Sequence, residues 1–142
     1  MDKADNDRPS PERSSLMARI GPRDSKPEMI VRRMVHALGY RFRLHRRDLP
    51  GTPDLIFPRL RKVIFVHGCF WHRHEGCRLT TTPKTRAEFW QEKFSRNVER
   101  DARKEDELRS LGWDVLTIWE CETRKPDILR NRLLSWLEQK LK

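Results

Sequence analysis

The sequence contains no apolar run long enough to cross a membrane, because the longest one covers only residues 63–66. Its first residues are polar and lack the apolar segment of a secretory signal peptide. Its 3 cysteines are an odd number, which excludes a fully paired disulfide framework. These absences predict a cytoplasmic protein in a reducing compartment, where thiols are more often metal ligands than bridges.

The length of 142 residues suits one domain, and the charge is strongly positive. Lys and Arg number 31 against 21 Asp and Glu, which gives a formal net charge of +10. A small basic domain is expected to bind a polyanion, and nucleic acid is the first candidate. The alternative is a soluble basic protein without such a partner.

Residues 1–23 differ in composition from the rest of the chain. They are rich in Asp, Arg, Pro and Ser, and Met17 and Ile20 are among their few apolar residues. Such a segment cannot bury enough apolar surface to order itself, so it is predicted to be a flexible N-terminal arm. Residues 24–142 are then a single domain without internal repeats.

Periodicity in that domain predicts alternating helices and strands. Ser25 and Glu28 have capping-box spacing, although Glu28 then needs no further role. The last helix has a predicted buried side made of Ile128, Leu129, Leu133, Trp136 and Leu137. Helices are predicted at residues 25–38, 86–108 and 126–141, and strands at 40–45, 54–57, 62–66 and 113–119. This order predicts an α/β fold with a mixed sheet flanked by helices.

All three cysteines can be metal ligands. Cys69, His74 and Cys77 have the spacing C-x4-H-x2-C, and Cys121 follows the last predicted strand. Thiolate and imidazole ligands at such spacing suit a closed, tetrahedral, structural zinc site. His72 is an alternative to His74, and burial of the cysteines as small apolar side chains is the alternative to metal binding.

A second set of residues could hydrolyse a phosphodiester. Asp54 enters a strand after a Pro-Gly-Thr-Pro turn, His67 ends the next strand, and His72 follows. Asn97 and Asp101 are four residues apart, so they share one helix face. A carboxylate can hold a hard cation such as Mg²⁺, and imidazole can activate water. Singly, Asp54 could only cap its turn, and Asp101 could belong to a solvated charge run.

Two aromatic residues, Phe70 and Trp71, stand between these candidate ligands in a predicted loop. Aromatic side chains beside basic ones can wedge between DNA bases. Alternatively, they pack the loop onto the sheet. Phe89 and Trp90 are predicted to be core residues or a cleft wall.

Taken together, these motifs resemble the very-short-patch-repair (Vsr) mismatch endonucleases. The most specific match is HGCFWH at residues 67–72 combined with WEC at 119–121. The similarity extends over about residues 17–136 and also includes LPGTPD (49–54), VIFV (63–66), RxxFWxxK (86–93) and NVERD (97–101).

The resemblance implies a restriction-endonuclease-like fold for residues 24–142, with a structural zinc site. It implies Mg²⁺-dependent nicking of one DNA strand 5′ of the thymine in a T:G mismatch. Such mismatches arise by deamination of 5-methylcytosine, and nicking initiates very short patch repair. The implied setting is a bacterial-type, nucleoid-associated monomer, with mismatch-repair proteins as candidate partners. A Vsr-like nuclease with another target, for restriction or in a mobile element, and a non-catalytic zinc-stabilised DNA-binding module are the alternatives.

The resemblance also implies roles for individual residues. Mg²⁺ ligands are the Asp54 carboxylate and the Val66 carbonyl. His72 is the expected water-activating base, with His67 as the alternative. Residues that organise metal-bound water or support the site are His67, Asp101, Glu28 and Asn97. Structural zinc ligands are Cys69, His74, Cys77 and Cys121. Residues that enter the DNA are Phe70, Trp71 and, from the arm, Met17.

Overall fold

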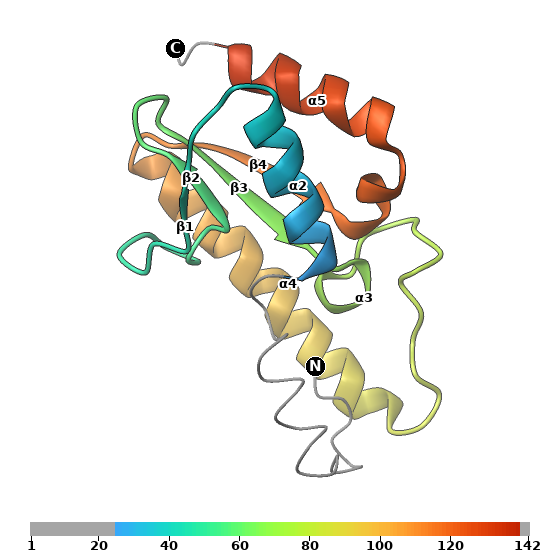
Figure 1. Cartoon of the computed structure of the whole chain (residues 1–142). Helices are drawn as coiled ribbons and strands as arrows, with labels where there is room; N and C mark the ends of the chain where they lie inside the picture. The colour runs from blue at the N-terminus through green and yellow to red at the C-terminus, as the bar shows by residue number, and fades with distance from the viewer. Residues whose placement is uncertain (1–24, 140–142) are drawn as a thin grey trace, which may run out of the picture.

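A four-stranded mixed sheet lies between helices in the computed structural model, which describes residues 25–139 (Figure 1). The predicted N-terminal arm, including Met17, lies outside the described residues. Strand order follows the sequence: β1 (Arg43–Leu44), β2 (Leu55–Phe57), β3 (Lys62–His67) and β4 (Asp114–Trp119). The first three strands are antiparallel neighbours, and β4 is parallel to β3. The α/β class and the mixed sheet are therefore confirmed.

Both faces of the sheet are covered. On one face, α2 (Lys26–Ala37) and α5 (Pro126–Glu138) pack on the sheet. On the other face, the end of α4 (Ala87–Ser110) packs through Leu108. Figure 1 shows this three-layer arrangement, with α4 crossing the side of the sheet opposite to α2 and α5. Because side chains alternate along a strand, Ile64 joins the first core and Val63 the second.

The helix starts and the central hairpin confirm the sequence predictions. Ser25 caps α2, where its Oγ accepts a hydrogen bond from the N–H of Glu28 at 3.3 Å. The predicted hairpin forms between β2 and β3, with Leu55 opposite Ile64. Between residues 25 and 139, no helix is both long and apolar enough to span a membrane.

Three predictions about local structure were wrong. The strand at residues 40–45 is reduced to two exposed residues, Arg43 and Leu44, and it ends there because His45 adopts a positive φ of 49° that leaves the extended backbone. Ile128 is 63% exposed, since Leu129 is the residue of that turn that faces the core. Phe70 and Trp71 lie in a short helix, α3 (Cys69–His72), rather than in a loop. The 3-10 helix η1 (Glu120–Arg124) was also not predicted.

Candidate active site and metal-binding cluster

An open cleft of about 860 Å³ lies beside the end of β3, between the segment that precedes β2 and helix α4. We call it the hydrolytic cleft. Predicted site residues that line it are Asp54, Val66, His67, His72 and Asp101. These residues come from four separate parts of the chain, so the fold brings together the set that the sequence singled out.

The Asp54 carboxylate is held by the neighbouring strand rather than by its own turn. Its Oδ2 accepts a hydrogen bond from the N–H of Val66 at 2.7 Å, and its own N–H donates to the carbonyl of Ile64 at 3.0 Å. Burial raises the pKa of Asp54 from 3.8 to about 7, and the negative charge of Glu28 adds to this, while the Val66 N–H opposes it. A buried carboxylate with a raised pKa is a good candidate for binding a cation.

His67, His72 and Asp101 form a second group in the cleft. His72 Nδ1 lies 2.6 Å from Asp101 Oδ2, so the carboxylate orients the ring and fixes which nitrogen faces it. The rings of His67 and His72 are stacked, with centroids 3.8 Å apart. Burial lowers the pKa of His67 to about 3, with a further contribution from His72, which keeps His67 neutral. An imidazole oriented by a carboxylate is a geometry that suits a general base.

Glu28 of α2 does not line the cleft but is buried close to Asp54, where it also contacts a histidine that was not predicted as a site residue. Arg32 contacts Glu28 Oε2 at 2.5 Å from the next turn of the helix. His45 Nε2 lies 2.9 Å from the same oxygen and 3.7 Å from Asp54 Oδ1. His45 was predicted to be part of a regular strand, in which side chains point alternately to the two faces of the sheet. Its positive φ removes it from that strand, so its position could not be predicted from the alternation. Its nearness to the LPGTPD motif was the one available signal.

Asn97 is not among the residues that line the cleft, although Asp101 on the same helix face is. Its Nδ2 donates a hydrogen bond to the carbonyl of Trp71 at 3.3 Å. The prediction that the amide and the carboxylate share the cleft is therefore correct only for Asp101. Asn97 lies one turn earlier in α4, where it holds α3 against the long helix.

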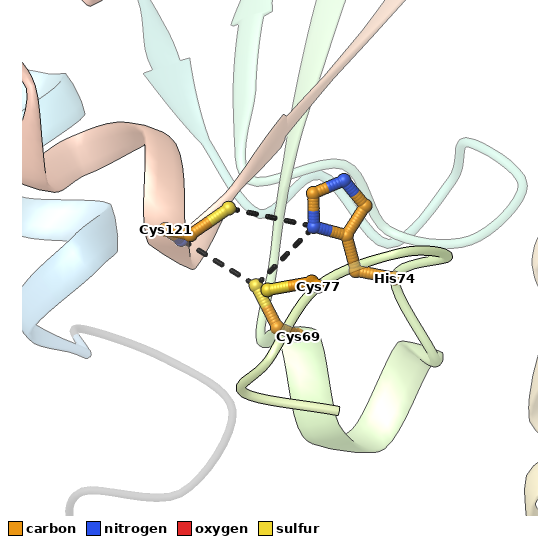
Figure 2. A group of neighbouring side chains, drawn as sticks. All are labelled: Cys69, His74, Cys77 and Cys121. Atoms are coloured by element: carbon orange, nitrogen blue, oxygen red, sulfur yellow. Dashed lines mark hydrogen bonds between the residues drawn. The ribbon is translucent and has the colours of Figure 1, made fainter. Parts of the chain in front are cut away.

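The second candidate site is the sulfur cluster, which consists of Cys69, His74, Cys77 and Cys121 (Figure 2). Figure 2 shows these side chains converging from α3, the loop after it and η1. The ligand atoms all lie within 4.8 Å of one another. The structure thus selects His74 over the alternative His72, which belongs to the cleft.

The spacing of the sulfur cluster fits a tetrahedral metal ion. His74 Nδ1 lies 3.6 Å from Cys69 Sγ and 3.4 Å from Cys121 Sγ. A tetrahedron with zinc–sulfur and zinc–nitrogen bonds has an S···N edge of about 3.6 Å. Backbone N–H groups of Cys121 and Leu79 also donate to Cys69 Sγ and Cys77 Sγ, each at 3.4 Å. Burial raises the pKa of the Cys69 thiol to about 12, so a thiolate there requires a cation.

The aromatic residues of α3 pack on α4 rather than on the sheet. Phe70 contacts Phe94 with ring centroids 5.2 Å apart, and Trp71 contacts Trp90 at 5.8 Å. The ammonium group of Lys93 lies 5.6 Å from the centroid of the Trp71 ring. Both α3 rings remain partly exposed, so they form an aromatic and basic surface beside the cleft. The two interpretations of Phe70 and Trp71, insertion into DNA and packing on the sheet, did not predict this contact with α4.

Comparison with known proteins gives consistent matches. Residues 1–78 match the family model described as DNA mismatch endonuclease Vsr. The type II nicking enzyme V.XorIIP of Xanthomonas oryzae is 50% identical over 133 residues, which cover 93% of this chain and 97% of that protein. The DNA mismatch endonuclease Vsr of Escherichia coli is 43% identical over 130 residues, which cover 88% of this chain and 83% of that protein. The type II nicking enzyme V.NmeAIP of Neisseria meningitidis is 39% identical over 121 residues, with 85% and 86% covered.

Proposed function

Because the chain belongs to the Vsr family of DNA endonucleases, we propose that it nicks one strand of T:G-mismatched duplex DNA in a Mg²⁺-dependent reaction. The nick falls 5′ of the thymine and initiates very short patch repair of deaminated 5-methylcytosine. The sheet and its helices then form a restriction-endonuclease-like fold. The single observation that carries the proposal is the convergence of Asp54, His72 and Asp101 on one open cleft.

The carboxylate of Asp54 and the carbonyl of Val66 are the proposed ligands of the catalytic cation. A bound Mg²⁺ supplies Lewis-acid charge for the scissile phosphate. The Val66 N–H holds Asp54 Oδ2 at 2.7 Å, which fixes the carboxylate relative to the end of β3. Glu28 lies behind Asp54 and supports it.

His72 is the proposed general base that removes a proton from the attacking water. Asp101 fixes the ring through Nδ1, which leaves Nε2 as the nitrogen that takes the proton. The neutral, stacked His67 and the Asp101 carboxylate order water in the cleft. Asn97 acts from outside by holding the backbone of Trp71, next to His72.

We assign the sulfur cluster to structural zinc and the aromatic surface to DNA binding. Cys69, His74, Cys77 and Cys121 would hold the ion and so would tie α3 and its following loop to the end of β4. Four protein ligands would leave no open position for catalysis. Phe70 and Trp71 intercalate beside the mismatch, and Met17 wedges from the other groove. The net charge of +10 supports binding of the phosphate backbone by the monomeric protein.

A second candidate is strand nicking at a different target. Relatives from Xanthomonas and Neisseria are named type II nicking enzymes rather than mismatch endonucleases. The distinction concerns the DNA that is recognised, not the chemistry of the cleft. Mismatch-repair proteins are candidate partners only under the first proposal.

The deciding experiment is a nicking assay with Mg²⁺ on three duplexes that differ in a single pair: T:G, U:G and matched. Each is prepared in varied flanking sequence, with either strand labelled. Preferential nicking of the thymine strand in the T:G duplex supports the mismatch function. Equal rates on matched DNA would support the second candidate, and intact DNA under all conditions would contradict both.

A further inference from the structure

His45 is the one cleft histidine without a place in the proposed reaction. Its side chain is only 11% exposed, and its Nε2 atom is buried. This atom approaches Glu28 Oε2 to 2.9 Å without forming an aligned hydrogen bond. A buried imidazole nitrogen that lacks an aligned hydrogen bond is costly unless another group satisfies it.

Two carboxylates flank this nitrogen. One oxygen of each acid, Glu28 and Asp54, lies with His45 Nε2 in a group whose members are all within 4.8 Å of one another. Neighbouring ligands of an octahedral ion with bonds near 2.1 Å are about 3 Å apart. The separation of 2.9 Å between Nε2 and Glu28 Oε2 fits such an edge, and 3.7 Å to Asp54 Oδ1 requires only a small adjustment.

The backbone holds His45 in this place. Its positive φ of 49° turns the chain at the end of β1, and its N–H donates to the carbonyl of Asp54 at 3.4 Å. On the other side, Arg32 contacts Glu28 Oε2 at 2.5 Å and so fixes the second acid. Asp54, at the other end of the connection from β1 to β2, is held by the N–H of Val66. The three candidate ligands therefore come from α2 and from the two ends of this connection, and each has its own anchor.

We infer that His45 is a direct nitrogen ligand of the cation at Asp54, and that the site consequently binds Mn²⁺ more tightly than Mg²⁺. This inference rests on the proposed metal site at Asp54. Imidazole nitrogen is a poor ligand for Mg²⁺, which prefers oxygen, and a better one for first-row transition metals. The site is thus a mixed nitrogen and oxygen site instead of an all-oxygen one.

The test uses Mn²⁺ as a paramagnetic probe of the full-length protein in the absence of DNA. Electron spin echo spectroscopy of bound Mn²⁺ should show the nitrogen coupling of a coordinated imidazole. His45→Gln should abolish this coupling and weaken Mn²⁺ binding about tenfold, with a smaller loss for Mg²⁺. His36→Gln, a change at an exposed histidine of α2, should leave both unchanged.

An unchanged nitrogen coupling in His45→Gln would overturn the inference, as would its absence from the wild-type protein. If His45→Gln does not fold, nuclear magnetic resonance of the wild-type protein decides. Mn²⁺ should then broaden the ring signals of His45 before those of His36, and the reverse order would overturn the inference. Wild-type protein that shows the coupling but does not nick T:G duplexes would contradict only the proposed function.

Discussion

The sulfur cluster and the hydrolytic cleft share one short helix but differ in kind. Helix α3 supplies Cys69 to the cluster and His72 to the cleft. In the cluster, four side chains converge at the distances of a closed tetrahedral site. In the cleft, carboxylates and imidazoles surround an open space. One turn of helix therefore couples a site suited to holding structure with a site suited to chemistry.

This difference teaches how each region should respond to damage. A closed site contributes its binding energy to folding, because the unfolded chain does not present the ligands together. An open site contains groups whose burial is costly, such as Asp54 with its raised pKa. Losing a cluster ligand should therefore lower stability, and losing a cleft carboxylate should lower the rate.

The largest effect is expected from Asp54→Asn, which removes the central charge of the cleft. Nicking should fall by about 10³-fold or more, since Lewis-acid catalysis is worth several kcal/mol. DNA binding should survive, and the melting temperature should stay the same or rise, because a buried charge is lost. Single-turnover nicking, a DNA-binding titration and thermal unfolding measure the three quantities. Asp127→Asn, an exposed acid of α5, is the control, and substantial nicking by Asp54→Asn would refute the mechanism.

The next largest effect is expected in the cluster. His74→Ala removes one of the four proposed zinc ligands, so bound zinc should be lost and the melting temperature should fall by about 10 °C or more. A strong chelator should lower the melting temperature of the wild-type protein similarly and that of the variant only slightly. His36→Ala controls for loss of an exposed histidine. A variant that contains no zinc but keeps the melting temperature of the wild-type protein would show that the cluster is not structural.

The cleft should also respond to pH. The proposed catalytic metal would bind the ionised carboxylate of Asp54, and burial raises the pKa of this group to about 7. Mn²⁺ affinity should therefore fall about tenfold for each pH unit below 7 and level off above it. Without the catalytic metal, the raised pKa of Asp54 makes a contribution to the free energy of unfolding that has the opposite pH dependence. The reason is that the folded protein keeps this carboxyl group protonated at pH values where the unfolded chain, with a pKa of 3.8, ionises it. That contribution is fully present at low pH and is lost as the pH rises through about 7.

Mn²⁺ titrations between about pH 5 and pH 8, in parallel with thermal unfolding, measure both trends. Asp54→Asn is the matched control, because it removes the titrating group without altering the fold around it. The stability of this variant should lack the pH dependence that comes from Asp54. Wild-type affinity that does not change across this range would mean that another group binds the metal.

The sulfur cluster and the hydrolytic cleft could be predicted from the sequence to different extents. The cluster was predictable, because Cys69, His74 and Cys77 are close in sequence and no other cysteine but Cys121 remains. The acids and histidines of the cleft were found through their motifs. His45 was missed, because a positive φ does not appear in an alternation of residue types.

Packing around the sheet shows the same limit. Lys62 is a basic residue at the start of β3, yet its side chain is buried. It is tolerated because Asp114 lies 3.0 Å away and the ring of Trp136 lies 4.7 Å away. Both partners come from distant elements, so neither propensity nor spacing could indicate them. Local sequence patterns therefore predicted the helices and strands. Residues that depart from those patterns, such as the buried Lys62, depend on tertiary contacts that the patterns do not contain.

The smallest predicted effect concerns the junction between the two regions. Asn97→Ala removes the hydrogen bond from Nδ2 to the Trp71 carbonyl, which lies in α3 between Cys69 and His72. One such bond is worth about 1 kcal/mol, so nicking should fall about fivefold. Zinc content and Mn²⁺ affinity should not change, because Asn97 belongs to neither ligand set. Asn131→Ala, an exposed amide of α5, is the control. A fall in both zinc content and nicking would instead show that α3 couples the two sites, and the separation between structure and chemistry would not hold.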